Sequence, residues 1–213
     1  MTHQVDPPGP DTTLKRLPER GSTDFDLACE IIDEAMVGHV GFTIDEQPYV
    51  VPMALGRDED ALLLHGSVVS RLMEHLAEGL PCCVTITHLD GLVLARSAFH
   101  YSMNYRSVMI FGKAALVTDE EEKSRCLDRL VEHLAPGRSR DLRESTSKEL
   151  NATSLLKLPI ETFTIKTRNG PPGDAAADIE APVWAGVIPL ALSAGDPVDA
   201  PDLADGIDLP DYL

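Results

Sequence analysis

Apolar side chains recur along this chain with two different periods, one typical of helices and the other of strands. Residues 24–37 carry apolar groups three and four positions apart, and Ser22 or Thr23 stands where a helix cap is expected. The same spacing predicts a second helix that begins near Ser67. A third predicted helix follows Thr118, which stands three positions before a glutamate, as in a capping box.

Alternating and continuous apolar runs, bounded by turn residues, predict seven strands. The predicted strands cover residues 38–44, 49–55, 61–66, 82–89, 92–99, 105–117 and 154–167, the last interrupted at Pro159. Asp90-Gly91 stands between two of these runs, and this dipeptide predicts a tight hairpin. Regular helical crossovers between strands are missing from the pattern. It therefore favours a mainly antiparallel barrel or sheet with inserted helices over a doubly wound fold.

Charge is distributed unevenly along the chain. The 213 residues include 18 Lys and Arg against 35 Asp and Glu, which gives a formal net charge of −17. No Lys or Arg follows Arg168, although nine acidic residues do. General binding of nucleic acid or of anionic membranes needs positive charge on the protein, so neither partner is expected.

The same composition divides the chain into three parts. Residues 1–22, rich in Pro, Thr and charge, are expected to form an N-terminal arm. Residues 23–192 are expected to form one compact domain of ordinary size. Residues 193–213 are mostly Asp, Pro, Gly and Ala with few large apolar groups, so we expect an acidic tail that is disordered or loosely docked.

The four cysteines show no spacing typical of a zinc site, and the seven histidines form no metal-binding pair on a helix. The N-terminus lacks the basic and apolar segments of a secretory signal. No apolar stretch approaches the length of about 20 residues that a membrane-spanning helix needs. We therefore expect no bound metal, reduced thiols and a cytoplasmic location.

One turn has the composition of an anion-binding site. A predicted strand that contains His65 ends at Gly66 and a helix begins at once, so free backbone N–H groups converge on the junction. Ser67 and Ser70 add hydroxyl groups, and Arg71 adds a forked cation. A phosphate is one expected ligand. A capped helix with an exposed arginine explains the same pattern, and both interpretations stay open.

Basic residues are scarce in the centre of the chain. Between Leu62 and Val117 the chain has only Arg71, Arg96, Arg106 and Lys113. Arg106 interrupts an apolar strand, and it points to the face opposite the one that carries Tyr105 and Ser107. A cation among the strand residues of an acidic protein faces either a bound anion or a paired carboxylate.

Four segments of the chain together resemble a known family. They are residues 62–72 (LLLHGSVVSRL), 90–114 (DGLVLARSAFHYSMNYRSVMIFGKA), 158–174 (LPIETFTIKTRNGPPGD) and 182–190 (PVWAGVIPL). They resemble the pyridoxamine 5′-phosphate oxidase-like FMN-binding split-barrel family, in the flavin-nucleotide-binding branch related to the nitroimidazole-resistance proteins. The resemblance implies a mainly β fold, an antiparallel split β-barrel with inserted and flanking helices. It also implies FMN bound at the interface of a homodimer.

The resemblance assigns roles to residues of the turn. Ser70 and Arg71 match the turn that holds the flavin phosphate. His65, Gly66 and Ser67 match positions beside the ribityl chain or the ring. His65 also coincides with the histidine assigned to the chemistry of the nitroimidazole-resistance proteins, so the resemblance implies that it is the catalytic residue.

Residues outside the turn also match the family. Tyr105, Arg106 and Ser107 match the strand that lies along the isoalloxazine ring, and Met53 lies on a neighbouring strand. Trp184 falls where members of the family send a C-terminal segment across the partner subunit. The resemblance therefore implies that all five positions contribute to cofactor binding.

These features imply an FMN-dependent oxidoreductase that acts on a small-molecule substrate. The tail beyond Arg168 lacks basic residues, which argues against a phosphorylated substrate such as pyridoxamine phosphate. No general acid–base pair is evident, so a non-catalytic flavin- or haem-binding module for storage or sensing is the alternative. A deazaflavin could replace FMN, and a haem would need an axial ligand such as His88 or His100.

Overall fold

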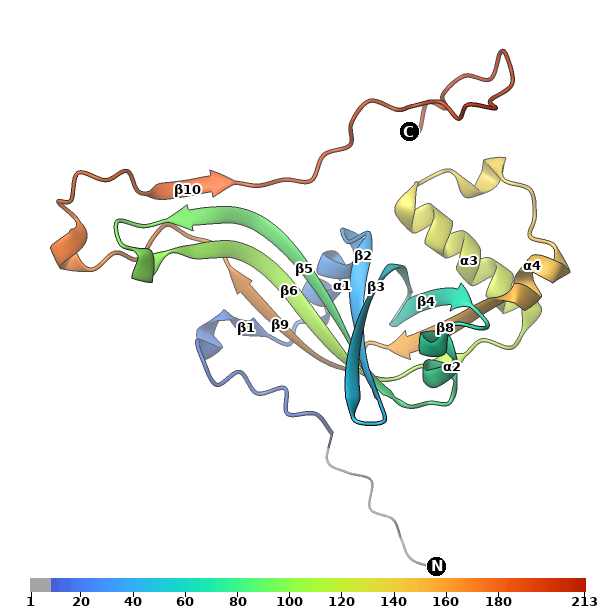
Figure 1. The fold of residues 1–213 in the computed structure, drawn as a ribbon, viewed down its shortest axis with the longest axis horizontal. Coiled ribbons are helices and arrows are strands. Elements are labelled where there is room, and N and C mark those ends of the chain that lie inside the picture. Colours follow the sequence, from blue (N-terminus) through green and yellow to red (C-terminus); the bar gives the residue numbers. More distant parts are fainter. Residues whose placement is uncertain (1–8) are drawn as a thin grey trace, which may run out of the picture.

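The computed structural model describes residues 9–213, and one antiparallel sheet of ten strands dominates it (Figure 1). The strands are β1 (Gly21–Ser22), β2 (Val37–Ile44), β3 (Gln47–Asp58), β4 (Ala61–Ser67), β5 (Pro81–Leu94), β6 (Ser102–Lys113), β7 (Ala115–Leu116), β8 (Thr153–Pro159), β9 (Thr162–Arg168) and β10 (Gly186–Pro189). The α-helices are α1 (Phe25–Asp33), α2 (Arg71–Ala77), α3 (Glu120–Leu134) and α4 (Ser147–Ala152). Short 3-10 helices are η1 (Pro18–Arg20), η2 (Ala98–His100), η3 (Ser139–Asp141) and η4 (Ala176–Asp178).

The strand order in the sheet is β1-β9-β6-β5-β2-β3-β4-β8-β7, and β10 pairs with β5 outside this path. Every one of these pairings is antiparallel. Because β1 and β7 end the path without pairing to each other, the curved sheet forms an open barrel. The predicted fold class, a mainly β antiparallel split barrel with inserted and flanking helices, is therefore confirmed.

Strand β3 belongs to both halves of the barrel. Residues 47–54 pair with β2, whereas residues 55–58 pair with β4 on the opposite edge of the strand. The part of β3 that pairs with β2 therefore has no strand on its β4 side. This interrupted ladder opens the barrel beside helix α2 (Figure 1).

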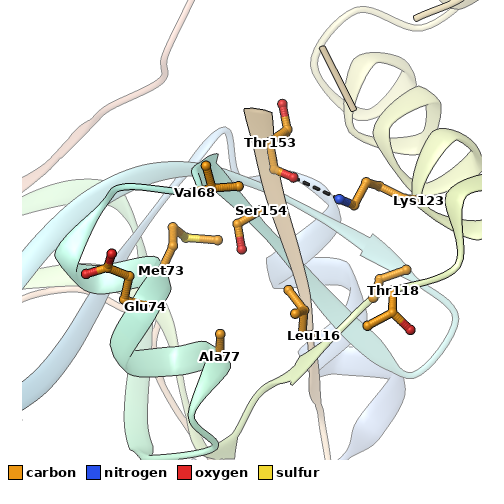
Figure 2. A pocket seen from close by; sticks show the side chains of 10 residues that line it. Val68, Met73, Glu74, Ala77, Leu116, Thr118, Lys123, Thr153 and Ser154 are labelled. Carbon is orange, nitrogen blue, oxygen red and sulfur yellow. Dashed lines mark hydrogen bonds between the residues drawn. The ribbon is translucent and has the colours of Figure 1, made fainter. Parts of the chain in front are cut away.

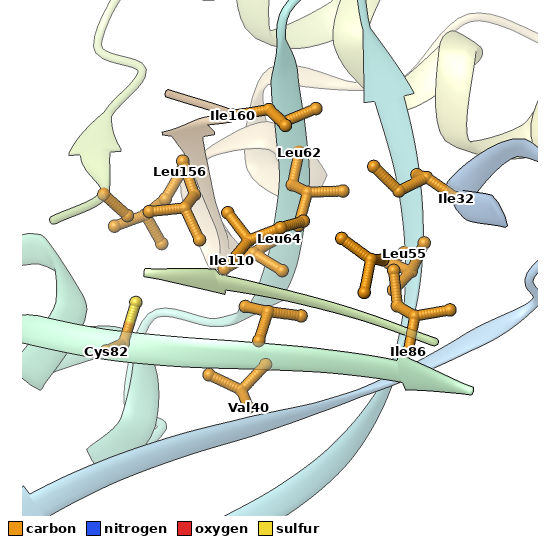
Figure 3. Packing of buried hydrophobic residues seen from close by; sticks show 14 of the residues in the cluster. Ile32, Val40, Leu55, Leu62, Leu64, Cys82, Ile86, Ile110, Leu156 and Ile160 are labelled. Carbon is orange, nitrogen blue, oxygen red and sulfur yellow. The ribbon is translucent and has the colours of Figure 1, made fainter. Parts of the chain in front are cut away.

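The core is aliphatic, as the scarcity of aromatic residues suggests. Side chains from β2, β3, β4, β5, β6 and β8 point toward one another in the barrel interior (Figure 3). Helix α1 packs against β3, β5 and β6 and buries Ala28, Ile31 and Ile32. Asp24 caps this helix by accepting the N–H groups of Asp26 at 3.0 Å and Leu27 at 3.3 Å.

Helix α1 is shorter than the predicted span of 24–37. Its helical turns end at Asp33, and Val37 already pairs with Ala54 of the neighbouring strand. The residues after Val37 bury alternate side chains and pair with both β3 and β5. Pairing on both edges of β2 therefore outweighs the helical preference of this short segment.

The hairpin predicted at Asp90-Gly91 is wrong, because β5 runs through both residues. A register shift at this point marks a bulge in the ladder with β6. A Cβ on Gly91 would lie 3.0 Å from Val187 Cγ1 and 3.1 Å from the carbonyl oxygen of Ile188. Gly91 therefore permits the close approach of β10, and the chain reverses later, around η2.

The other two predicted helices form, but they begin later in the chain. Helix α2 begins at Arg71 instead of near Ser67, and Val69 before it is 79% exposed. The cap of α3 is Asp119, whose carboxylate accepts the N–H of Glu122 at 2.8 Å; the predicted Thr118 is not the cap. The sequence did not predict α4. Within residues 9–213 no helix has the length and apolarity needed to cross a membrane.

The C-terminal segment runs from β10 to the end of α3 (Figure 1). Its Tyr212 hydroxyl donates to Asp141 and accepts a hydrogen bond from Arg138 at 3.3 Å. The Arg140 guanidinium lies 5.0 Å from the centroid of the Tyr212 ring. At the other end of the chain, Gly21 and the residue after it pair with β9, and residues 1–8 of the predicted arm lie outside the described part.

A buried carboxylate ties α3 and β8 to the end of β3. Asp58 is 6% exposed, and its two oxygens accept hydrogen bonds from Arg125 at 3.0 and 2.9 Å. Lys157 Nζ lies 3.2 Å from the same carboxylate. The hydrogen bond from Arg125, reinforced by Lys157, lowers the pKa of Asp58 from 3.8 to about 2.

Protonation of Asp58 is expected to destabilise the fold. Because its pKa is lower in the folded protein than in the unfolded chain, its contribution is complete above 3.8 and is lost as the pH falls to about 2. We expect Asp58→Asn to lower the free energy of unfolding at neutral pH by about 2 kcal/mol. Urea denaturation measures this change.

A matched control replaces an exposed carboxylate. Asp11 forms an exposed pair with Lys15 at 3.7 Å, and Asp11→Asn is expected to leave the urea midpoint almost unchanged, because solvent screens the pair. Equal losses of stability in the two variants would show that the buried carboxylate of Asp58 contributes no more to stability than an exposed one.

Candidate functional site

The open edge of β3 and the end of β4 frame an opening in the barrel. Strand β4 pairs with β3 only as far as the pair Leu64↔Leu55, and beyond it continues along β8. His65 is the first residue past that pair, and Met53 lies on the part of β3 without a β4 partner. Met53 and His65 therefore stand on the two strands that flank the gap in the β3–β4 ladder, which we call the opening.

The turn after β4 closes one end of this opening. The N–H of Ser70 donates to the carbonyl of Ser67 at 2.9 Å. A Cβ on Gly66 would lie 3.0 Å from Met73 Cγ, so glycine allows α2 to pack closely against the strand end. Ser70 precedes α2 at the N-cap position, but its side chain makes no capping hydrogen bond. The hydroxyl of Ser70 is therefore not used by the helix.

Arg71 extends from the first residue of α2 over the ring of Tyr49, with its Cζ 4.4 Å from the ring centroid. Among the residues that the structure describes, Arg71 forms no salt bridge. Arg57, Arg96 and Arg106 all pair with carboxylates. Helix α2 has only seven residues, so its N-terminus is not an anion-binding site by itself. The positive charge at this turn therefore comes from the guanidinium of Arg71. Arg71 is thus a stacked cation without a neutralising partner.

His65 carries a buried ring nitrogen that the protein does not use. Its Nδ1 has no hydrogen-bond partner within the described residues. Burial lowers the pKa of His65 below the ordinary value of 6.5, so the imidazole is neutral at neutral pH. A neutral imidazole with a free nitrogen can take part in proton transfer or ligate a metal centre.

A cavity of about 340 Å³ lies on the other side of the turn, between α2, β8 and α3 (Figure 2). Val68 and Met73 supply apolar walls, and Lys123 extends toward it from α3. Lys123 Nζ donates to the carbonyl oxygens of Leu150 at 3.1 Å and Thr153 at 2.9 Å. The charge of Lys123 therefore caps the end of α4 and is not directed toward the turn that carries Arg71.

Tyr105 and Ser107 lie on the outer face of the sheet. They alternate along β6 with Asn104, Arg106 and the fully buried Val108, and Met109 continues the same outer row. The hydroxyl of Ser107 donates to the carbonyl oxygen of Lys166 on β9 at 3.1 Å. Register places Met109 beside Thr85 of β5. The strand that the resemblance places along the isoalloxazine ring therefore carries Tyr105, Ser107 and an exposed methionine on its outer face.

Arg106 lies on the opposite face of β6 and is paired with two carboxylates. Its Nε and Nη2 donate to Asp90 at 3.1 and 3.0 Å, and its Nη1 donates to Glu34 at 2.8 and 2.7 Å. These hydrogen bonds, with Asp90 foremost, raise the pKa of Arg106. The arginine fastens the end of α1 to β5. The structure does not bring it to the turn that carries Arg71, and its contacts fit the paired-carboxylate interpretation.

Trp184 stands apart from the opening within one chain. It precedes β10, which lies at the end of the β5–β6 ribbon far from α2 (Figure 1). The Trp184 ring is 64% exposed and covers Gly186, where a Cβ would lie 2.8 Å from it. A cofactor site that includes Trp184 and Arg71 together would need a second copy of the chain.

The two histidines considered as haem ligands each have one ring nitrogen engaged. His88 Nε2 donates to the carbonyl oxygen of Ile31 at 2.8 Å, and His100 Nδ1 lies 2.9 Å from Ser97 Oγ. His88 also lines a cavity of about 660 Å³ with Arg106 under the C-terminal segment. The described residues contain no cluster of three or more side chains able to hold a metal ion.

The chain is a split barrel with an arginine unpaired among the described residues and a histidine with a buried ring nitrogen beside the gap in its β3–β4 ladder, and comparison with known families identifies its class. A family model described as pyridoxamine 5′-phosphate oxidase matches residues 24–167. The chain belongs to this family. The resemblance drawn from the sequence is therefore confirmed.

Solved structures give the same result. A protein from Mycobacterium smegmatis described as FAD and haem binding is 40% identical, with a TM-score of 0.87, and the match covers 91% of this chain and 95% of that one. The flavocytochrome Anf3 from Azotobacter vinelandii is 36% identical, with a TM-score of 0.89 and 94% of each chain covered. A 5-nitroimidazole antibiotic resistance protein from Bacteroides thetaiotaomicron is 29% identical with a TM-score of 0.57, over 68% of this chain and 85% of that one. Among curated proteins none matches.

Sequence reasoning missed the aromatic side chains beside Arg71. Tyr49 lies under its guanidinium, and His75 follows it by one helical turn. The four-residue spacing of Arg71 and His75 was a usable signal, because such pairs share a helix face. Tyr49 gave no local signal, since only the interrupted β3–β4 ladder places it beside α2.

His65 is expected to stay neutral at a pH where an exposed histidine is protonated. An NMR titration of its ring protons should give a midpoint below 6.5, because burial disfavours the charged ring. The His65→Gln variant identifies the signal by its loss. A midpoint at or above 6.5 would contradict the burial of this ring.

Proposed function

We propose that the protein binds a flavin nucleotide in the opening between β3 and α2, with Arg71 holding a phosphate. The main support is the Arg71 guanidinium, which has no acidic partner among the described residues of a chain with a net charge of −17. Ser67 and Ser70 stand on the same turn and supply hydroxyl donors. Met53 and His65 border the opening on either side. The similar proteins described as FAD binding and as a flavocytochrome support the same conclusion.

Among the flavins, we favour FAD as the natural ligand, with FMN and a deazaflavin as competitors. The resemblance implies FMN, but a protein that is 40% identical over 91% of this chain is described as binding FAD. When bound, a flavin supplies hydride and electron transfer. The chain then acts as an oxidoreductase on a small molecule, with Arg71 fixing the phosphate and His65 available as a proton donor or acceptor. We expect this activity in the cytoplasm, where the four free cysteines stay reduced.

A homodimer completes the proposed site. The outer face of the sheet exposes apolar side chains on several strands, among them Val37, Val50 and Met109. Ser107 and Tyr105 share this face, although they are remote from Arg71 by strand order. Pairing of two such faces would cover the apolar groups and bring the outer residues of one chain toward the opening of the other.

A haem bound through His65 is the second candidate. The specific observation is the buried Nδ1 of His65, which has no partner within the described residues, on a ring that stays neutral. His88 and His100 are weaker candidates because each already uses one ring nitrogen. Two structures that match 91% and 94% of this chain are described as FAD and haem binding and as a flavocytochrome, respectively.

Removal of Arg71 is expected to weaken flavin binding. The loss of a hydrogen-bonded cation should raise the Kd of FMN and FAD about 10-fold to 150-fold in Arg71→Ala. Quenching of flavin fluorescence measures both constants. Arg143→Ala removes the same charge from an exposed pair with Glu149 and should leave both constants unchanged. An unchanged Kd in Arg71→Ala would place the phosphate elsewhere.

Haem binding is expected to depend on His65 alone among the three histidines. Titration of the purified protein with haem should give a Soret band that His65→Ala loses. The same band should persist in His88→Ala and His100→Ala, because those rings are held by the protein itself. Loss of the band in one of these two variants, with retention in His65→Ala, would reassign the ligand.

A charge on the outer face is expected to dissociate the dimer. Met109 is 37% exposed on β6, and Met109→Glu should give a monomer in analytical ultracentrifugation because two like charges would meet at the contact. Leu134→Glu on α3, which is 41% exposed, is the matched control and should stay dimeric. A wild-type protein that sediments as a monomer would contradict the proposed interface.

A further inference from the structure

A further cavity adjoins Tyr49, the ring on which Arg71 stacks. Its volume is about 510 Å³, and it lies between the β2–β3 hairpin, the second half of α2 and the first residues of β5. Its walls include Phe42, Tyr49, Val50, His75, Leu80 and Pro81. Figure 1 shows the β2–β3 hairpin, α2 and the start of β5 near one another.

Aromatic rings connect the Arg71 cation to this cavity. The Arg71 guanidinium lies 4.4 Å from the centroid of Tyr49, whose ring stacks on Phe42 at 5.4 Å. Phe42 in turn lies 5.3 Å from the ring of His75. Arg71 and His75 are four residues apart on α2 and therefore share one face of the helix. The cation and the cavity are neighbouring parts of one surface.

The lining of the cavity selects an uncharged, planar group. None of its 11 lining residues is Asp, Glu, Lys or Arg, although the chain as a whole is rich in acids. Aromatic and proline side chains supply flat apolar surface, while His75 and Thr43 supply polar groups at its margin. Leu80 at the rim is 37% exposed, so this apolar surface is open to a ligand.

We propose that this cavity receives the adenine base of an FAD molecule whose phosphates lie at Arg71, an inference that rests on the proposed flavin site. A heteroaromatic base matches the uncharged aromatic lining, and the adjoining guanidinium matches the phosphates that carry it. FMN ends at its phosphate and leaves the cavity unused. The same residues therefore determine a preference for FAD over FMN.

The preference between the two flavins tests this subsite. Purified flavin-free protein is titrated separately with FAD and FMN, and fluorescence quenching gives each Kd. We expect the wild-type protein to bind FAD about 5-fold to 150-fold more tightly than FMN, which is the range for stacking of one base on an aromatic side chain. His75→Ala removes one ring, and Leu80→Trp fills the cavity from its rim. Both variants are expected to lose the preference while their Kd for FMN stays within about two-fold of the wild-type value.

Three outcomes would count against the subsite in distinguishable ways. Equal affinities for FAD and FMN in the wild-type protein would overturn it while leaving the flavin site intact. An equal loss of both flavins in His75→Ala and Leu80→Trp would also overturn it, since the cavity would then act on the shared part of the ligand. Failure of the wild-type protein to bind either flavin would overturn the proposed function itself. Leu142→Trp, at an exposed position far from α2 in the sequence, is the control and should keep the preference.

Discussion

Strand β3 changes its partner halfway along, and the rest of the structure depends on that change. Its first eight residues pair with β2 and its last four pair with β4 on the other edge. Beyond the pair Leu64↔Leu55, β4 continues along β8, and the turn that follows it leads into α2. The opening and the position of Arg71 over Tyr49 both depend on this interrupted ladder.

Because the chain is rich in acidic residues, several of its arginines pair with carboxylates, and these differ in role from an arginine without such a pair. Arg57 and Arg106 fasten α1 to the sheet through carboxylates, and Arg125 fastens α3 through Asp58. These pairs join elements that are distant in sequence, so their charges serve the fold. Arg71 stacks on Tyr49 and lacks such a partner among the described residues. Under the proposed function, this free guanidinium is the one that binds the phosphate of the ligand.

The parts of the site that follow local periodicity could be read from the sequence, and the parts that depend on strand pairing could not. Alternation along β6 correctly placed Arg106 and Ser107 on opposite faces. The dipeptide Asp90-Gly91 looked like a turn, because a local pattern cannot show that β10 will pack against Gly91. Tyr49 was overlooked for the same reason, since its importance comes from a neighbour that is remote in the chain.

The sequence by itself determined the mainly β composition, three of the four α-helices near their final places, the family and the turn from His65 to Arg71. Short-range spacing and side-chain chemistry are sufficient for these features. The tertiary structure alone decided which arginines are neutralised, which His65 nitrogen has no partner, and which aromatic rings surround Arg71. These properties depend on contacts between segments that are distant in the sequence, and such contacts form only when the strands pair.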